Sequence, residues 1–251
     1  MTDAGALRDR PVLVTGANGG IGLGIVRALL ENGHRAVACH YHSRSDRLDA
    51  LLRERGLDPA TYAHAGDLTD EDAVAAMHAA FGERFGTFWG VVNVAGASSN
   101  AMSWRMPLAE FKRIVDANLV STFLCTRAYA PEMRERGGGR IINFASVVAE
   151  IGVAGVSHYG AAKAAILGFT KSAAIELAPR GVTVNALALG YIEVGLIDTI
   201  PAPIQAQLLE TIPTKRFGRV AEIAALVRYL LADESAYATG HTFRLNGGLD
   251  R

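Results

Sequence analysis

Apolar runs of strand length alternate with amphipathic stretches of helical length along the whole chain of 251 residues. The strand-like runs lie near 11–15, 35–41, 60–64, 88–94, 139–145, 182–188 and 241–245. Helical patterns fill most of the gaps, near 20–32, 45–55, 70–86, 107–135, 158–179 and 220–232. Such alternation is typical of a parallel sheet with helices on both faces. The sequence therefore predicts an α/β fold with a doubly wound, seven-stranded parallel sheet, in a single domain over residues 1–251.

The stretch 190–218 interrupts this alternation and contains Pro201, Pro203 and Pro213. It is too long to be a simple connection between a strand and a helix. We expect it to form short helices and to cover a substrate at the edge of the sheet.

Composition narrows the class of protein. Lysine plus arginine and aspartate plus glutamate each total 25, so the net charge gives no reason to expect binding to nucleic acid. Cys39 and Cys125 fall in a predicted strand and a predicted helix, where they are small buried residues and not a disulfide. The N-terminus lacks the apolar core of a signal peptide, and no apolar stretch reaches the ~20 residues of a membrane span. We expect a soluble, cytoplasmic protein that does not bind membranes.

A glycine-rich turn follows the first predicted strand and precedes the first predicted helix. Its sequence is Thr15-Gly16-Ala17-Asn18-Gly19-Gly20-Ile21-Gly22. In this context the glycines let the backbone turn tightly and approach a pyrophosphate, whose charge suits the N-terminus of a helix. The pattern predicts a dinucleotide site that uses Gly16, Asn18, Gly20, Ile21 and Gly22.

Ser146, Tyr159 and Lys163 have the spacing that acid–base chemistry on a carbonyl requires. Tyr159 and Lys163 stand four residues apart in a helix-favouring stretch, so they share a helix face. A free tyrosine has a pKa of about 10, and a nearby ammonium lowers that pKa and makes the phenol useful for proton transfer. Ser146 follows the predicted strand 139–145, so we expect its hydroxyl to meet this helix and to hold a carbonyl oxygen.

The ordered set of motifs resembles the short-chain dehydrogenase/reductase family over nearly the whole chain. The set comprises the glycine-rich turn, Asp67-Leu68, Asn93-Val94-Ala95-Gly96, Asn118, Ser146, Tyr159 and Lys163. The resemblance implies a Rossmann-type fold and hydride transfer between a nicotinamide cofactor and a carbonyl. It implies that Tyr159 donates the proton and that Ser146 polarises the carbonyl oxygen. It also implies that Lys163 bonds the nicotinamide ribose and that Asn118 holds a water that feeds protons to the tyrosine.

The same resemblance implies further cofactor contacts at the ends of strands. They come from Asp67, Leu68, Asn93, Ala95, Gly96, Gly190 and Ile192, together with Tyr159 and Lys163. Two positions depart from the family pattern: Leu189 stands where proline is frequent, and Val194 replaces a threonine that bonds the nicotinamide carboxamide. We expect the backbone of Ile192 to hold the carboxamide instead.

The end of the second predicted strand bears on which nicotinamide cofactor binds. Its residues are His40, Tyr41, His42, Ser43 and Arg44, with no carboxylate before Asp46. NAD-preferring sites usually offer a carboxylate to the ribose, whereas Arg44 and Ser43, with a histidine, suit a 2′-phosphate. The histidines are otherwise ordinary polar residues at a strand end, and without a third ligand they predict no metal site. We favour NADPH; Gly19, where many NADP-dependent relatives carry arginine, leaves NADH open.

The segment 190–218 and the ending Asn246-Gly247-Gly248 resemble the subgroup of reductases that act on 3-oxoacyl thioesters of acyl carrier protein. This resemblance implies an NADPH-dependent ketoreductase of fatty acid or polyketide biosynthesis. Carrier proteins are acidic, so Arg136 and Arg180 are the expected docking cations. Met102, Trp104, Leu196 and Ile197 are expected to line an apolar channel for the acyl chain.

The resemblance also implies a homotetramer that pairs through the long helices 107–135 and 158–179 and through the last strand. Two other functions stay open. One is an NAD-linked dehydrogenase or reductase of a free alcohol, sugar or cyclic ketone, and the other is a non-catalytic cofactor-binding protein.

Overall fold

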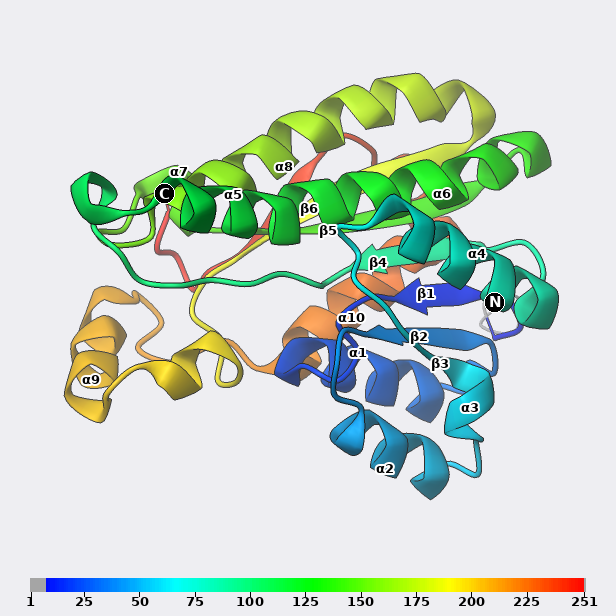
Figure 1. The fold of residues 1–251 in the computed structure, drawn as a ribbon, viewed down its shortest axis with the longest axis horizontal. Helices are drawn as coiled ribbons and strands as arrows, with labels where there is room; N and C mark the ends of the chain where they lie inside the picture. Colours follow the sequence, from blue (N-terminus) through cyan, green and yellow to red (C-terminus); the bar gives the residue numbers. More distant parts are fainter. Residues whose placement is uncertain (1–7, 251) are drawn as a thin grey trace.

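The computed structural model describes residues 8–250, without the side chains of Leu196 and Thr199 (Figure 1). Its sheet is parallel throughout, in the order β3-β2-β1-β4-β5-β6-β7. The strands are β1 (Val12–Val14), β2 (Val37–Tyr41), β3 (Ala63–Ala65), β4 (Gly90–Asn93), β5 (Gly139–Ser146), β6 (Val182–Leu189) and β7 (Thr242–Leu245). The seven-stranded, doubly wound sheet is confirmed, and its order changes direction between β1 and β4, where folds of this kind bind ligands.

Helices cover both faces of the sheet. The helices α1 (Gly20–Glu31), α2 (Asp46–Glu54) and α10 (Val220–Leu231) share one core, whereas α4 (Glu71–Phe85), α6 (Ser121–Arg136) and α8 (Ser157–Leu177) share the other. Successive residues of a strand face opposite sides, so Val12 and Val14 join the first core and Leu13 the second. Figure 1 shows α6 and α8 above the sheet and α1 and α2 below it.

The third strand begins later than the sequence predicts. Residues Pro59–Tyr62 form the short helix α3, and the strand follows only at Ala63. Pro59 is preorganised for the first turn of a helix, and the Asp58 carboxylate accepts a hydrogen bond from the Ala60 N–H at 3.2 Å. The predicted strand 60–64 is therefore wrong in its first half, because local capping overrides the apolar pattern.

The predicted helix 107–135 is one continuous helical segment, but its helical geometry changes along its length. It consists of α5 (Leu108–Val115), a π-helical turn η2 (Asp116–Val120) and α6. Short helical turns lie elsewhere at η1 (Ser103–Arg105), α7 (Val148–Ile151), η3 (Ala178–Arg180) and η5 (Asp233–Ser235). No helix within residues 8–250 is both long enough and apolar enough to span a membrane.

The segment after β6 forms the expected short helices, η4 (Leu196–Thr199) and α9 (Ala202–Thr211). Its two ends are joined by a parallel bridge between Ile192 and Gly218. In Figure 1 this segment, coloured yellow to orange, stands beside the carboxyl ends of the strands and below α5. The sheet therefore positions it over the edge where ligands bind.

Candidate active site

Ser146 and Tyr159 meet where the carboxyl end of β5 faces the start of α8. Ser146 is the last residue of β5, and its Oγ accepts a hydrogen bond from the Val148 N–H at 3.2 Å. Tyr159 lies in the first turn of α8, and its phenol is hydrogen-bonded to the Ser146 side chain. The predicted pair is thus brought together, with the serine hydroxyl fixed by backbone.

Lys163 lies one turn further along α8, where it is almost fully buried. Its Nζ donates a hydrogen bond to the Phe144 carbonyl at 2.6 Å and lies 5.6 Å from the centroid of the Tyr159 ring. Burial lowers the pKa of the Lys163 ammonium to about 7. The lysine can therefore gain or lose a proton near neutral pH.

The expectation that the ammonium lowers the pKa of Tyr159 is not met in this arrangement. Burial raises the pKa of Tyr159, and the hydrogen bond with Ser146 offsets only part of that rise. The Lys163 Nζ donates its hydrogen bond to the Phe144 carbonyl of β5 and not to the phenol, so it does not stabilise the phenolate. In this state the phenol is a protonated donor, which is the form that protonation of an alkoxide needs.

Asn118 is fully buried within the π-helical turn η2. Its Nδ2 donates to the Ile114 carbonyl at 2.8 Å and to the Ala97 carbonyl at 2.7 Å, while its Oδ1 has no partner among the residues that the structure describes. The Oδ1 faces Gly96, where a Cβ would collide with it and would lie 3.5 Å from the Lys163 Nζ. A buried acceptor without a partner beside an ammonium suits a bound water. This geometry supports the predicted role of Asn118.

The glycine-rich turn forms a cradle that side chains would fill. Gly16 has φ +63°, and a Cβ there would lie 3.0 Å from the Ala95 Cα; a Cβ on Gly22 would collide with the Gly16 carbonyl. Helix α1 begins at Gly20 without a side-chain cap, so its first N–H groups are available to an anion. These residues fit a pyrophosphate. Nearby, a Cβ on Gly20 would come within 2.8 Å of the Val194 side chain, which brings the segment after β6 to this loop.

Thr15 holds the cradle against β4, a contact that the sequence analysis did not single out. Its Oγ1 accepts hydrogen bonds from the Val94 and Ala95 N–H groups, each at 3.0 Å. The signal in the sequence is a hydroxyl residue between the apolar run Val12–Val14 and the first glycine of the turn.

Several predicted cofactor side chains contact protein groups in this structure. Asn18 accepts a hydrogen bond from the Leu48 N–H at 2.8 Å, and Asp67 accepts two from Thr69. The Asn93 amide donates to Asn143 Oδ1 at 2.9 Å beneath the helices. For Asn93 this leaves the backbone, and not the amide, to make the predicted cofactor contact.

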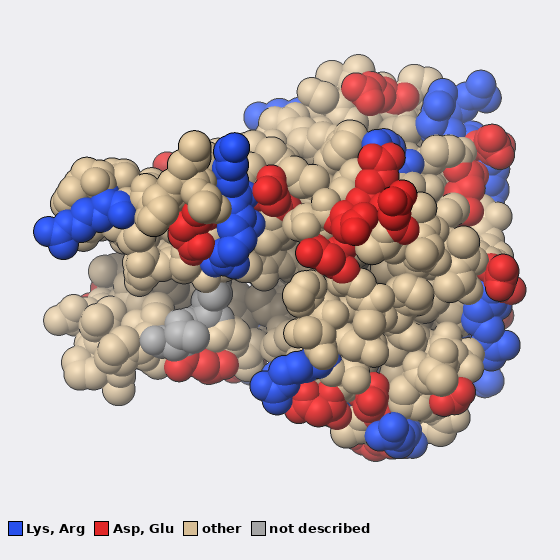
Figure 2. Space-filling model, viewed as in Figure 1, with Lys and Arg blue, Asp and Glu red and all other residues tan. Residues whose placement is uncertain are grey.

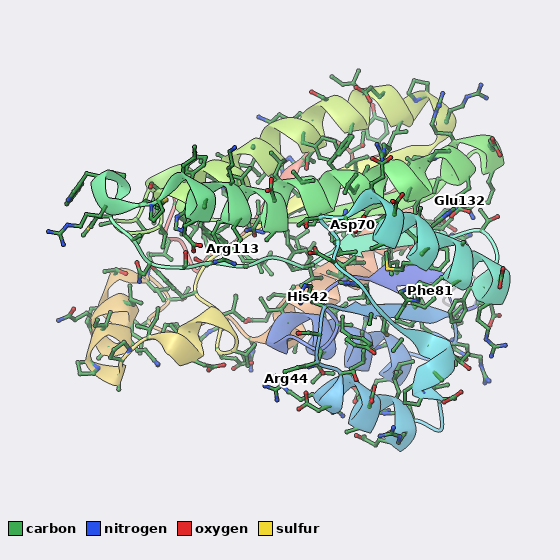
Figure 3. All side chains as sticks on the ribbon, in the orientation of Figure 1. His42, Arg44, Asp70, Phe81, Arg113 and Glu132 are labelled. Carbon is green, nitrogen blue, oxygen red and sulfur yellow. The ribbon has the colours of Figure 1, made fainter. Side chains whose placement is uncertain are left out.

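The loop after β2 offers exposed groups at the same edge. Figure 3 shows His42 and Arg44 beside the gap between the sheet and the segment after β6. The Arg44 side chain is 81% exposed, and its Nε lies 3.6 Å from Asp46 Oδ1. Tyr41 is half-buried, and Ser43 is exposed. A cation that is exposed and only loosely paired can hold a 2′-phosphate. His40, by contrast, is buried.

The predicted substrate residues do not all share one surface. Met102 and Trp104 are exposed, the latter by 76%, whereas Ile197 is buried. Leu196 lies outside the described side chains. Figure 2 shows the surface hollowed between the part that carries α5 and the segment that carries α9. Gly190 and Ile192 lie at the root of that segment, where a Cβ on Gly190 would come within 2.7 Å of the Asn246 Cα.

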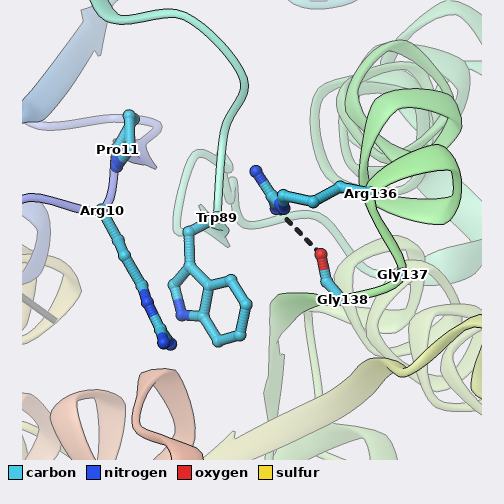
Figure 4. A pocket seen from close by; sticks show the side chains of 6 residues that line it. All are labelled: Arg10, Pro11, Trp89, Arg136, Gly137 and Gly138. Carbon is cyan, nitrogen blue, oxygen red and sulfur yellow. Dashed lines mark hydrogen bonds between the residues drawn. The ribbon is translucent and has the colours of Figure 1, made fainter. Parts of the chain in front are cut away.

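The expected docking cations lie at the opposite end of the sheet from Ser146. Helix α6 ends at Arg136, three residues before β5 begins, and Arg180 precedes β6 by two residues. Since β5 then rises by about 3.3 Å per residue, Arg136 is roughly 25 Å from the mouth of the site. Arg136 also donates to the Thr87, Phe88 and Gly138 carbonyls, beside Trp89 and Arg10 (Figure 4). Their expected position near the mouth of the same chain is therefore wrong.

Known proteins resemble this chain over nearly its whole length. Residues 16–250 match the family profile described as enoyl-(acyl carrier protein) reductase. The 3-oxoacyl-[acyl-carrier-protein] reductase FabG of Staphylococcus aureus is 38% identical over 243 residues, which cover 96% of this chain and 98% of that protein. Nodulation protein G of Azospirillum brasilense is 39% identical over 97% of this chain and 99% of its own length. A 3-oxoacyl-[acyl-carrier-protein] reductase of Synechocystis sp. is 37% identical over 97% of this chain and 98% of its own length.

Proposed function

Since this chain belongs to the short-chain dehydrogenase/reductase family, we propose that it is an NADPH-dependent ketoreductase. Its substrate is a 3-oxoacyl thioester on acyl carrier protein, which it reduces to the 3-hydroxyacyl form in fatty acid or polyketide synthesis. The observation that carries the proposal is the cluster of Ser146, Tyr159, Lys163 and Asn118 beside a pyrophosphate cradle. The reductases of S. aureus and Synechocystis sp. are named for this reaction.

NADPH, when bound, supplies the hydride that the substrate carbonyl accepts. The residues that would hold its pyrophosphate are Gly16, Asn18, Gly20, Ile21 and Gly22. Asp67, Leu68, Ala95 and Gly96 would hold the adenosine, and Tyr41, His42, Ser43 and Arg44 would hold the 2′-phosphate. Gly190 and the backbone of Ile192 would hold the nicotinamide carboxamide, since the Val194 side chain offers no hydrogen bond.

Ser146 and Tyr159 act on the carbonyl oxygen. The Ser146 hydroxyl, fixed by the Val148 N–H, donates a hydrogen bond to that oxygen and polarises the carbonyl. The raised pKa of Tyr159 keeps the phenol protonated, so that it can give its proton to the alkoxide. The phenolate that remains must then recover a proton.

Lys163 and Asn118 return this proton. The pKa of Lys163 is about 7, so its ammonium can release a proton toward the phenolate at neutral pH. The unpartnered Asn118 Oδ1 near the Lys163 Nζ is placed to hold the water that resupplies the lysine. The chain of groups is therefore solvent, water at Asn118, Lys163 and Tyr159.

The carrier and the assembly belong to the same proposal. A two-fold axis perpendicular to α6 and α8 would run the helices of two copies antiparallel. That pairing would bring the Arg136 and Arg180 end of one copy to the active-site end of the other. Phe123 on α6 and Ile175 on α8 are 42% and 78% exposed, and such exposed apolar side chains suit an interface. A homotetramer would thus bring Arg136 and Arg180 to the mouth of a neighbouring copy. Met102 and Trp104, which are exposed, would receive the acyl chain.

A second function is favoured by one observation. The Asp46 carboxylate lies 3.6 Å from the Arg44 guanidinium and 3.4 Å from the Asn18 amide, and Gly19 offers no cation. A carboxylate there suits a ribose hydroxyl, as in an NAD-linked dehydrogenase of an alcohol, sugar or cyclic ketone.

The test is oxidation of NADPH and of NADH against a panel of carrier-bound 3-oxoacyl chains, small-thiol thioesters, quinones and cyclic ketones. We expect the highest kcat/KM with NADPH and carrier-bound 3-oxoacyl substrates. Turnover restricted to free ketones, or to NADH, would favour the second function. No turnover with any substrate, with both cofactors still binding, would favour a non-catalytic protein.

A further inference from the structure

His40 lies buried near the end of β2 with both of its ring nitrogens in use. Nε2 lies 3.0 Å from the Gly66 carbonyl, and Nδ1 lies 3.3 Å from the Gly16 N. A carbonyl can only accept and an N–H can only donate, so the proton sits on Nε2 and Nδ1 is the acceptor. His40 therefore bridges two backbone segments in one tautomer.

Both segments belong to the dinucleotide site. Gly16 opens the pyrophosphate cradle with φ +63°, and Gly66 precedes Asp67 and Leu68. The backbone adds to the bridge, because the His40 carbonyl accepts from the Ala17 N–H at 2.8 Å. His40 thus links the loop after β1 to the loop after β3 by hydrogen bonds to both.

The bridge needs a neutral imidazole. Burial lowers the pKa of His40 to about 4, and the nearby His64 and His42 favour the same direction. The hydrogen bond to the Gly66 carbonyl and the charge of Asp67 oppose it and do not prevail. Across the neutral range Nδ1 keeps its lone pair for the Gly16 N–H, and neither nitrogen is available to a phosphate.

We infer that His40 is a positioning residue for the dinucleotide, which holds the pyrophosphate cradle and the Gly66–Leu68 loop at a fixed separation. This replaces the expectation that His40 contacts the 2′-phosphate. The segments that it joins face the parts that NADPH and NADH share, so His40 sets the affinity for both. The inference rests on dinucleotide binding alone, and the identity of the carbonyl substrate does not enter it.

The test compares His40→Leu and His40→Asn with a matched control, His34→Leu. Leucine removes both hydrogen bonds, whereas the Asn Oδ1 can still accept from the Gly16 N–H. His34 is also buried, and burial likewise lowers its pKa to about 4, but its ring nitrogens have no hydrogen-bond partner among residues 8–250. The Kd for NADPH and for NADH is measured by nucleotide fluorescence, and kcat is measured at saturating cofactor.

We expect His40→Leu to raise both Kd values about tenfold and in parallel, which corresponds to one or two lost hydrogen bonds. His40→Asn should raise both Kd values by a smaller factor, and His34→Leu should leave both Kd values and kcat unchanged. A loss confined to NADPH would overturn the inference, because it would mean a direct contact with the 2′-phosphate. Unchanged Kd values in a folded His40→Leu would overturn it as well. If His40→Leu does not fold, the test rests on His40→Asn: a parallel rise in the Kd for NADPH and for NADH, smaller than tenfold, supports the inference, and unchanged Kd values or a loss for NADPH alone overturn it.

Discussion

Lys163→Met should make the protein more stable while it abolishes turnover. The lysine is buried and donates a hydrogen bond to the Phe144 carbonyl. Its pKa falls from the ordinary 10.5 to about 7. That difference costs about 4 kcal/mol of folding free energy at pH 7. Methionine fills a similar volume without a charge. Loss of the hydrogen bond and an unpartnered carbonyl offset about half of the gain, which leaves about 2 kcal/mol.

The sign of the effect gives it a characteristic dependence on pH. Between pH 7 and 10.5 the unfolded chain carries a proton on Lys163 that the folded chain has lost. Stability of the wild-type protein therefore rises with pH across this window through this group, and the methionine variant lacks that rise. The difference between the two proteins should shrink from pH 7 to pH 9.

The assay is urea unfolding and thermal unfolding at pH 7 and pH 9, at equal protein concentration because assembly shifts apparent stability. A gain of about 2 kcal/mol raises Tm by about 5 °C in a chain of this size. Lys171→Met is the matched control, since Lys171 lies two turns further along α8 and is exposed. If Lys163→Met is less stable than wild type at pH 7, the buried charge is compensated and the reasoning fails.

Tyr159→Phe should lower kcat by at least the roughly 10²-fold expected of a general acid, with the Kd for NADPH unchanged; near-normal turnover would remove the tyrosine from its assigned role. Gly96→Ala places a Cβ against Asn118 Oδ1 and should lower kcat more than it raises KM, as steady-state kinetics would reveal. Arg44→Ala should weaken NADPH binding and leave NADH binding intact, and Asp46→Asn should strengthen NADPH, both read by titration; equal effects on both nucleotides would place the 2′-phosphate elsewhere. Light scattering should give a tetramer mass at micromolar concentration, and a monomer mass would refute the assembly.

The strands and long helices follow from the sequence because apolar runs of strand length alternate regularly with stretches of helical length. Where two local signals compete, the pattern misleads. Asp58 and Pro59 start a helix in a stretch whose apolar character predicts strand. The π-helical turn η2 could not be predicted from the apolar pattern, because one extra residue changes that pattern too little to be recognised.

The catalytic residues could be predicted because they depend on spacing along two elements that the sequence defines well. The contacts of the cofactor side chains were harder to predict. Asn18 lies in the glycine-rich turn and Asn93 is the last residue of β4, and polarity does not tell whether such an amide faces a ligand or another part of the protein. The position of Arg136 depends on the end of the sheet at which α6 finishes. The presence of cations near the end of a predicted helix does not say which end that is.

The wide turn at Asp116–Val120 has a consequence for how this helix can change over evolution. One additional residue in a turn rotates everything after it by about 100° around the helix axis. The extra residue therefore changes which side chains of the helix face inward after the turn. As a result, α5 can face the mouth of the site and α6 can face the sheet, although no single apolar repeat runs through both helices. A deletion of one residue here would restore an ordinary helix and rotate Asn118 out of register with either α5 or α6. The number of residues in this turn is consequently as informative as their identity. In a related sequence, a one-residue deletion within 116–120 would indicate that the buried amide of Asn118 is no longer held in place.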